Sequence, residues 1–321
     1  MFVNEGFLDM RKTDKNFGIS RYDGFTLMEL LVVIAIIMML VGILVPGMRA
    51  IKRLSKNLQQ KSLFHSIEIG VELFLKDFGD YPDSKRSEPD PPTGLLYYCG
   101  AQHLAEAMVG RDERGYEPVQ SRRWYWPGDE PPSVESVNYD LYWSSKKSLD
   151  RRKITYIELK KTGAYDPGEI YDDTGQVYSD PGYSGVPEGE LSLRGPVLTD
   201  VFLKKKITTT NGDNIKVGSP ILYYKANRNS RLFEKAGPAI PGDTDKWIFN
   251  YKDNIDLVDL GAVGDDDPSI QHLMDETLFY ETITNPGVSY EKPFNSTTFI
   301  LISAGDDSVF GTKDDVTNFN Y

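Results

Sequence analysis

The chain has 321 residues, 40% of them hydrophobic and 26% charged, so it can fold as one large globular domain or two small ones. Its formal net charge of −12 argues against a sequence-independent nucleic-acid-binding protein, because such a protein needs a basic surface for the phosphates, and we expect no nucleic-acid partner. The single cysteine, Cys99, excludes an intrachain disulfide.

An apolar segment near the N-terminus has the length of a membrane span. Residues 25–45 read FTLMELLVVIAIIMMLVGILV, with Glu29 as the only charge, and about 20 apolar residues cross a bilayer core. No small-residue cleavage site of the secretory type follows Val45. We therefore expect the segment to stay in the protein, either as an ordinary signal anchor or in a more specialised role.

The start of the span, GFTLMELL at residues 24–31, resembles the processing site of type IV prepilins and type II secretion pseudopilins. The resemblance implies that residues 1–24 are a cleavable leader and that a prepilin peptidase cuts after Gly24. It also implies N-methylation of Phe25. We expect a single-pass protein of the inner membrane, with a cytoplasmic N-terminus and a periplasmic or other extracytoplasmic C-terminal domain.

We interpret residues 25–46 as a transmembrane helix through which the protein polymerises. Glu29 and Pro46 in this helix are predicted to affect assembly. A carboxylate inside a membrane helix costs roughly 2.5–3.5 kcal/mol and is usually functional. Glu29 is therefore predicted to pair with the α-ammonium of Phe25, in the family typically that of a neighbouring subunit; the alternative is an acid at the membrane edge. Pro46 removes a helical hydrogen bond and marks either a bend that helps packing in a filament or the helix boundary at the membrane exit.

Basic residues stand on both sides of the span. The leader has four basic and four acidic residues, and the basic residues after the span are Arg49, Lys52, Arg53, Lys56 and Lys61. The positive-inside rule alone is ambiguous for such a chain. The expected orientation therefore depends on the processing motif.

The apolar positions after the span predict that the helix continues through residues 47–80. They recur at spacings of three, four and seven, as on one face of an amphipathic helix. They are Ile51, Leu54, Leu58, Ile67, Val71, Phe74, Leu75 and Phe78. Gly79 and Pro82 end the helix, and its apolar face is expected to pack on a globular domain.

Residues 81–220 are interpreted as rich in loop insertions, because proline and acidic residues cluster there. A short helix is expected at 101–109, and strands at 221–225, 247–251 and 298–303, where β-branched and aromatic residues concentrate. The predicted fold is α+β. A long N-terminal α-helix, transmembrane in its first half and amphipathic in its second, packs on an antiparallel β-sheet domain with large loop insertions.

The predicted C-terminal β region, residues 221–321, ends in an acidic loop, SAGDDSVFGTKDDVTNF at 303–319. A solvated turn is one interpretation. The order of residues is also similar to a loop near the C-terminus of the major pseudopilin of type II secretion systems, and that resemblance implies a structural Ca²⁺. The implied ligands are the carboxylates of Asp307, Asp314 and Asp315 and the backbone carbonyls near Ala304 and Phe310. The alternating acidic order of an EF-hand is missing.

These features favour a structural filament subunit, a pseudopilin of a type II secretion-like system. Its expected partners are other pilin-like subunits, the prepilin peptidase, an inner-membrane assembly platform and membrane lipid. The alternative is a type IV pilin for adhesion, motility or DNA uptake, although many such pilins have a C-terminal disulfide loop that Cys99 alone cannot form.

Two further hypotheses belong to other classes of protein. A membrane-anchored hydrolase is disfavoured, because the sequence has no G-x-S-x-G, no H-E-x-x-H, no P-loop and no dinucleotide glycine motif; we therefore expect no enzymatic activity. A binding module on a filament would use the Trp- and Tyr-rich middle of the chain, with Trp124 and Trp126 on a sugar- or protein-binding face.

Overall fold

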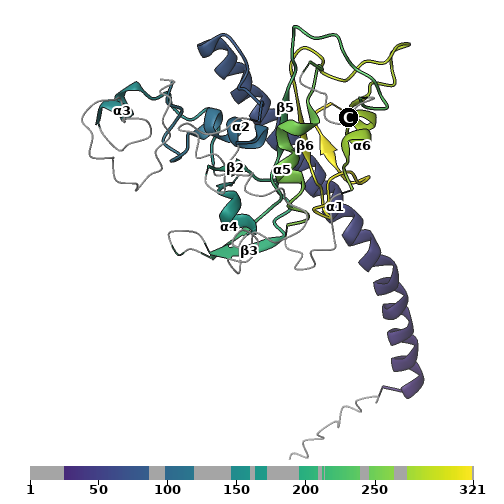
Figure 1. Ribbon diagram of the computed structural model, residues 1–321. Coiled ribbons are helices and arrows are strands. Elements are labelled where there is room, and N and C mark those ends of the chain that lie inside the picture. Colours follow the sequence, from purple (N-terminus) through teal and green to yellow (C-terminus); the bar gives the residue numbers. More distant parts are fainter. Residues whose placement is uncertain are drawn as a thin grey trace, which may run out of the picture. The chain divides into compact units, whose positions relative to one another are not determined.

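The computed structural model describes residues 25–86, 98–118, 146–159, 163–171, 195–208, 212, 214–238, 246–263 and 273–319 (Figure 1). The chain divides into two compact units, Met1–Ile51 and Lys52–Tyr321. The expected leader at 1–24, which includes Gly24, lies outside the described residues, as do Trp124 and Trp126.

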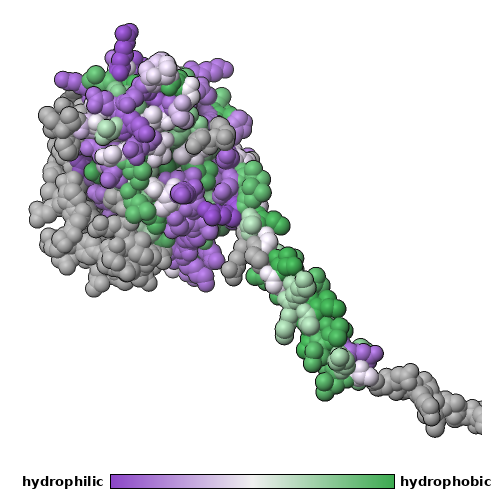
Figure 2. Space-filling model, turned by 90° about the vertical axis from the view of Figure 1, so that its right-hand side faces the viewer, coloured by the Kyte–Doolittle hydropathy of each residue, from purple (hydrophilic) through white to green (hydrophobic). Residues whose placement is uncertain are grey.

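Helix α1, Leu27–Phe78, is 52 residues long, which confirms the predicted long N-terminal helix. It ends where Gly79 adopts a left-handed φ of 80° and donates its N–H to the carbonyl of Leu75 at 2.7 Å. Every residue from Leu27 to Val45 is exposed, and this part of the helix forms a nearly continuous hydrophobic surface (Figure 2). It is apolar enough to cross a membrane, with a mean hydropathy of 3.0 over its most apolar window.

The second half of α1 contributes one face to the core of the second unit. The buried residues of this face are Leu63, Phe64, Ile67, Val71 and Phe74. The prediction that Ile51, Leu54 and Leu58 belong to the same buried stripe is wrong for a single chain, because these side chains are 68%, 61% and 60% exposed. Their spacing is that of an amphipathic helix, but exposure in a single chain is not what this spacing predicted.

A three-stranded antiparallel sheet lies at the centre of the second unit. It is formed by β5 (Leu222–Lys225), β6 (Phe299–Ser303) and β7 (Val316–Thr317), in the order β5-β6-β7. Tyr223 pairs with Leu301, and Ser303 pairs with Val316. The strands predicted at 221–225 and 298–303 are therefore confirmed.

The central sheet separates two hydrophobic clusters. Phe299 and Leu301 on one face of β6 pack with the buried face of α1, whereas Ile300 and Ile302 on the other face join a cluster with α6 (Glu276–Ile283). Both faces of the strand are covered, so all five residues of β6 are buried and no polar-apolar alternation marks the strand in the sequence.

Helix α2, Gly100–Val109, confirms the helix predicted at 101–109 and packs within this core. Leu104 and Met108 are fully buried. At Gly70 of α1, a Cβ atom would stand 2.9 Å from the sulfur of Met108. The absence of a side chain at residue 70 therefore lets α1 lie close to α2.

The remaining elements are short. They are α3 (Lys146–Arg151), β1 (Ala164–Tyr165), α4 (Pro167–Tyr171), β2 (Val197–Leu198), β3 (Lys205–Thr208), β4 (Asn214–Val217), η1 (Tyr251–Asn254) and α5 (Ile255–Val258). Strands β1 and β2 form one antiparallel pair, and β3 and β4 form another.

The strand predicted at 247–251 is wrong. Trp247 forms only an isolated bridge with Leu232, and a 3₁₀ turn begins at Tyr251. The Asn250 side chain caps this turn by accepting a hydrogen bond from the N–H of Lys252 at 3.1 Å. The aromatic residues that suggested a strand are instead buried in the core: the Tyr251 hydroxyl donates to the carbonyl of Met274 at 2.9 Å.

Candidate functional site

Reciprocal hydrogen bonds between Thr26 and Glu29 close the N-terminus of α1. The Glu29 N–H donates to Thr26 Oγ1 at 3.2 Å, and Glu29 Oε2 accepts from the Thr26 N–H at 2.9 Å and from its hydroxyl at 2.8 Å. This is a capping box, whose signature is Thr-x-x-Glu before an apolar run. The sequence analysis did not predict this cap, because it interpreted Glu29 as a partner of another subunit or as an acid at the membrane edge.

Phe25 and Pro46 are the other described residues of this segment for which the sequence predicts a role. The Phe25 side chain is 76% exposed beside the capping box. At position 46 the backbone is helical and α1 continues for many residues beyond it. The helix therefore does not end at Pro46.

The acidic loop connects β6 to β7. Hydrogen bonds between its own backbone and side chains hold its conformation. Asp314 Oδ2 accepts the N–H of Asp307 at 3.0 Å, and Asp314 Oδ1 accepts the Thr312 hydroxyl at 2.6 Å. Asp315 Oδ2 accepts the N–H of Gly311 at 2.9 Å. Gly305 has a φ of 70°, and a Cβ there would stand 2.2 Å from the carbonyl oxygen of Asp314.

The three predicted ligands of the loop differ in their electrostatic surroundings. Burial raises the pKa of Asp315 to about 7. For Asp307, burial and the neighbouring Asp314 raise the pKa, although the Val309 N–H opposes them. For Asp314, burial also raises the pKa, but hydrogen bonds from Thr312 and Asp307 outweigh it and the net direction is down.

Two oxygen atoms of the loop bear on the predicted calcium ion. Asp315 Oδ1 and Ser308 Oγ are buried without a hydrogen-bond partner, and a cation would satisfy such atoms. Within the described ranges, however, no group of three or more acidic, histidine or cysteine side chains is arranged to hold a metal ion. A calcium site in this loop would therefore need backbone and hydroxyl oxygens in addition to the carboxylates.

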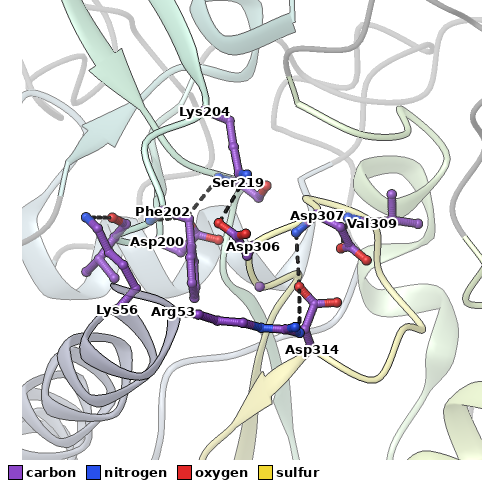
Figure 3. Close-up of polar contacts among 12 residues, drawn as sticks. Arg53, Lys56, Asp200, Phe202, Lys204, Ser219, Asp306, Asp307, Val309 and Asp314 are labelled. Atoms are coloured by element: carbon purple, nitrogen blue, oxygen red, sulfur yellow. Dashed lines mark hydrogen bonds and ion pairs between the residues drawn. The ribbon is translucent and has the colours of Figure 1, made fainter. Parts of the chain in front are cut away.

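Basic residues from two other segments contact this loop (Figure 3). Arg53 of α1 lies 3.8 Å from Asp314 Oδ2, and Lys204 lies 3.2 Å from Asp306 Oδ1. Lys56, one turn after Arg53, donates to the carbonyl of Val201 at 2.7 Å. Segments around residues 53, 201 and 314 are thereby brought together.

Asp200, which directly precedes Val201, is a buried carboxylate. Oδ1 accepts the N–H groups of Phe202 at 3.0 Å and Ser219 at 3.2 Å, and Oδ2 accepts the Ser303 hydroxyl at 3.0 Å. Burial raises the pKa of Asp200 to about 7, although these hydrogen bonds oppose the rise. Asp200 thus ties the chain before β3 to the end of β6, a role that no local pattern in the sequence indicates.

The lone cysteine is a structural residue. Cys99 is fully buried before α2, and its N–H donates to Gln102 Oε1 at 3.1 Å. Burial raises the pKa of its thiol to about 12. The thiolate, which is the nucleophilic form, is therefore strongly disfavoured at neutral pH.

An open polar cleft of about 550 Å³ lies elsewhere on the second unit, near the C-terminal end of α1. Its acidic residues include Asp80 and Asp253. Asp80 pairs with Lys225 at 2.7 Å, and Asp253 accepts the Ser84 hydroxyl at 2.5 Å. These carboxylates tether the segment after α1 to β5 and η1.

Comparison with known proteins identifies the N-terminal segment. The family model described as the prokaryotic N-terminal methylation motif matches residues 19–45, and this motif is typical of type IV prepilin-like proteins. No curated protein and no solved structure matches the chain.

Proposed function

We propose that this chain, which carries the N-terminal methylation motif of type IV prepilin-like proteins, is a structural filament subunit: a pseudopilin of a type II secretion-like system. One observation carries the proposal. The apolar half of α1 lies within the residues that the motif matches, and it is exposed on every side in a single chain. Such a surface is covered first by lipid and then, after assembly, by the helices of neighbouring subunits.

Assembly begins with removal of the leader after Gly24 by a prepilin peptidase and with N-methylation of Phe25. The new ammonium of a neighbouring subunit then has a partner in Glu29. In the structure Glu29 Oε2 accepts both hydrogen bonds from Thr26, and Oε1 accepts none among the described residues. The carboxylate can therefore cap its own helix and still accept a bond from another chain.

The contact between subunits extends beyond the membrane span. Ile51, Leu54 and Leu58 follow the span on α1 and are more than half exposed. In the proposed filament they pack against the α1 helices of neighbouring subunits. The chain is inserted once in the inner membrane with its N-terminus in the cytoplasm, and the inner-membrane assembly platform extracts it from there. It has no enzymatic activity in this account.

A calcium ion in the acidic loop serves a structural role in this proposal. Asp307, Asp314 and Asp315 would hold it, and the unpartnered Asp315 Oδ1 supports the fit. When bound, the ion offsets the cost of burying carboxylates in a fold that has no disulfide. It adds no chemistry of its own.

A type IV pilin is the alternative, and a strain lacking the gene distinguishes the two. We expect secreted enzymes to disappear from the culture supernatant while surface filaments remain at normal number. Loss of filaments with normal secretion would instead assign the chain to a pilus for adhesion, motility or DNA uptake. The lone Cys99 and the acidic loop favour the first outcome.

A further inference from the structure

The open polar cleft near the C-terminal end of α1 has the size of a small-ligand site. Its volume is about 550 Å³, and sites for small molecules commonly measure roughly 300–1,000 Å³. Three segments of the second unit line it: the turn after α1 at 79–85, the loop after β5 at 225–229, and residues between 247 and 253 at the start of η1. The filament assembly proposed above uses none of these residues.

Hydrogen bonds join the three segments to one another. The Lys225 N–H donates to Ser84 Oγ at 3.0 Å, and this hydroxyl donates to Asp253 Oδ2 at 2.5 Å. The Asn227 N–H donates to the carbonyl of Ile248 at 2.7 Å. The walls of the cleft are therefore in place before a ligand arrives, which lowers the cost of binding.

Asp83 and Asn227 are exposed side chains of the cleft that are held in position by the backbone. Asp83 Oδ1 accepts the N–H groups of Ser84 at 2.9 Å and Lys85 at 3.3 Å, and Asn227 Oδ1 accepts the N–H of Asn229 at 3.1 Å. Asp83 Oδ2 and Asn227 Nδ2 make no hydrogen bond to a described residue. One acceptor and one donor, each on a side chain that is already fixed, are thus left for a ligand.

The charges of the cleft balance. Its described lining has three carboxylates and three cationic side chains, which are Asp80, Asp83, Asp253, Lys85, Lys225 and Arg228. Lys225 pairs with Asp80 at 2.7 Å, and Arg228 lies over the ring of Tyr81, 4.8 Å from its centroid. A strongly charged ligand of either sign would therefore meet no net opposite charge in the cleft.

The cleft offers little apolar surface. The apolar side chains of its described lining are Ala226, Trp247 and Ile248, and each of these residues is at most 8% exposed. The Trp247 ring packs against Tyr280, with ring centroids 4.8 Å apart. A peptide that binds through its side chains, or a lipid, needs apolar pockets. The cleft instead favours a ligand that binds through hydrogen bonds.

We propose that this cleft binds a neutral saccharide. A hydroxyl group both donates and accepts hydrogen bonds, so sugar hydroxyls can accept from Asn227 Nδ2 and donate to Asp83 Oδ2 without a charge on the ligand. The exposed side chains of Lys85 and Asn229 supply further donors. Because the described lining offers no aromatic ring for stacking, we expect weak affinity, in the millimolar range. A chain that forms no filament can still bind the sugar, so the proposal does not depend on the filament assignment.

The test uses the full chain in lipid nanodiscs and saturation-transfer difference NMR, with empty nanodiscs as the blank. The probes are maltose, cellobiose and the disaccharide of N-acetylglucosamine, each titrated through the millimolar range. A neutral tripeptide of alanine, acetylated and amidated at its ends, is the comparison. We expect a saturable signal from at least one disaccharide and none from the peptide. The absence of a saturable signal from all three sugars, or a stronger signal from the peptide, would overturn the proposal.

Matched variants assign the signal to the cleft. Asn227→Asp keeps the acceptor for the Asn229 N–H but removes the Nδ2 donor, and Asn229→Ala removes an amide that makes no hydrogen bond to a described residue. Each is expected to lower the saccharide signal several-fold with little change in Tm. The control is Asn285→Asp, because Asn285 Oδ1 accepts the N–H of Gly287 at 2.8 Å in the same kind of turn outside the cleft. Signals as strong in Asn227→Asp and Asn229→Ala as in the control would overturn the proposal.

Discussion

Glu29 accepts the backbone and side-chain hydrogen bonds of Thr26 through a single carboxylate oxygen, at 2.9 Å and 2.8 Å. The other oxygen has no hydrogen-bond partner among the described residues. One side chain can therefore cap its own helix and pair with the N-terminal amine of another subunit. These two roles make different demands, because capping needs only an acceptor whereas pairing with an ammonium needs a negative charge.

The substitution Glu29→Gln separates the two roles. A glutamine at this position preserves the capping box but removes the charge, so we expect normal membrane insertion and at least a tenfold loss of filaments. Glu29→Val should show the same assembly defect. Thr26→Ala removes only the cap, at a cost of about 0.5–2 kcal/mol, and should assemble better than either. Filaments are counted by electron microscopy, and normal numbers for Glu29→Gln would refute the pairing role.

Calcium is expected to stabilise the second unit. The fragment 52–321 suits this measurement, because every buried hydrophobic residue of the described chain lies at Leu63 or later. Saturation at about 100 times the Kd contributes about 2.7 kcal/mol, or roughly 5–10 °C in Tm for a unit of this size. An unchanged melting curve after chelation would remove calcium from the account.

Two substitutions in the acidic loop give this experiment its controls. Asp315→Asn should abolish the response to calcium and yet leave the chelated protein as stable as the unsubstituted one, because it removes a carboxylate that is costly to bury. Asp306→Asn should keep the response, since Asp306 is more than half exposed and is not among the implied ligands. A calcium response that survives in Asp315→Asn would place the ion elsewhere.

Asp200 should be important for stability through its hydrogen bonds. Asp200→Ala leaves the buried N–H groups of Phe202 and Ser219 without their acceptor, at a cost of about 2–4 kcal/mol. Asp200→Asn retains an acceptor for both and should cost much less. Chemical denaturation of the fragment 52–321 measures the two free energies of unfolding. Equal losses for alanine and asparagine would show that the hydrogen bonds are not the cause.

The same residue predicts a pH dependence. Burial raises the pKa of Asp200 to about 7 in the folded chain, compared with about 3.9 for an unfolded aspartate. The folded chain therefore binds the extra proton between these values. Protonation of Asp200 therefore stabilises the folded chain fully below about pH 4, and this stabilisation is lost as the pH rises through about 7. In chelator, the Tm of Asp200→Asn should rise relative to the unsubstituted fragment across this range; a constant difference would show that Asp200 does not titrate there.

The long helix and two central strands could be predicted because their signals are local. The apolar run to Val45, the helical spacing of Ile67, Val71 and Phe74, and the stop at Gly79 each belong to a single segment. The prediction of a strand at 247–251 was wrong, because the same aromatic residues also suit a buried 3₁₀ turn when Asn250 caps it.

The parts that could not be predicted depend on contacts between distant segments. Asp200 receives its donors from residues up to 103 positions away, and no spacing rule joins it to Ser303. The Lys56–Val201 contact likewise brings α1 beside the chain before β3, although 145 positions separate the two residues in the sequence. By contrast, the capping box has a local signal, Thr26-x-x-Glu29, so the sequence alone was sufficient to predict it.

The N-terminus of the mature protein tests the central claim most directly. Protein purified from the membrane of the source organism is analysed by mass spectrometry, with Gly24→Ala as the comparison. The account predicts that residues 1–24 are absent, that N-methylated Phe25 is the first residue, and that Gly24→Ala retains the leader. A mature protein that keeps its leader, or normal processing of Gly24→Ala, would contradict the assignment of this chain as a prepilin.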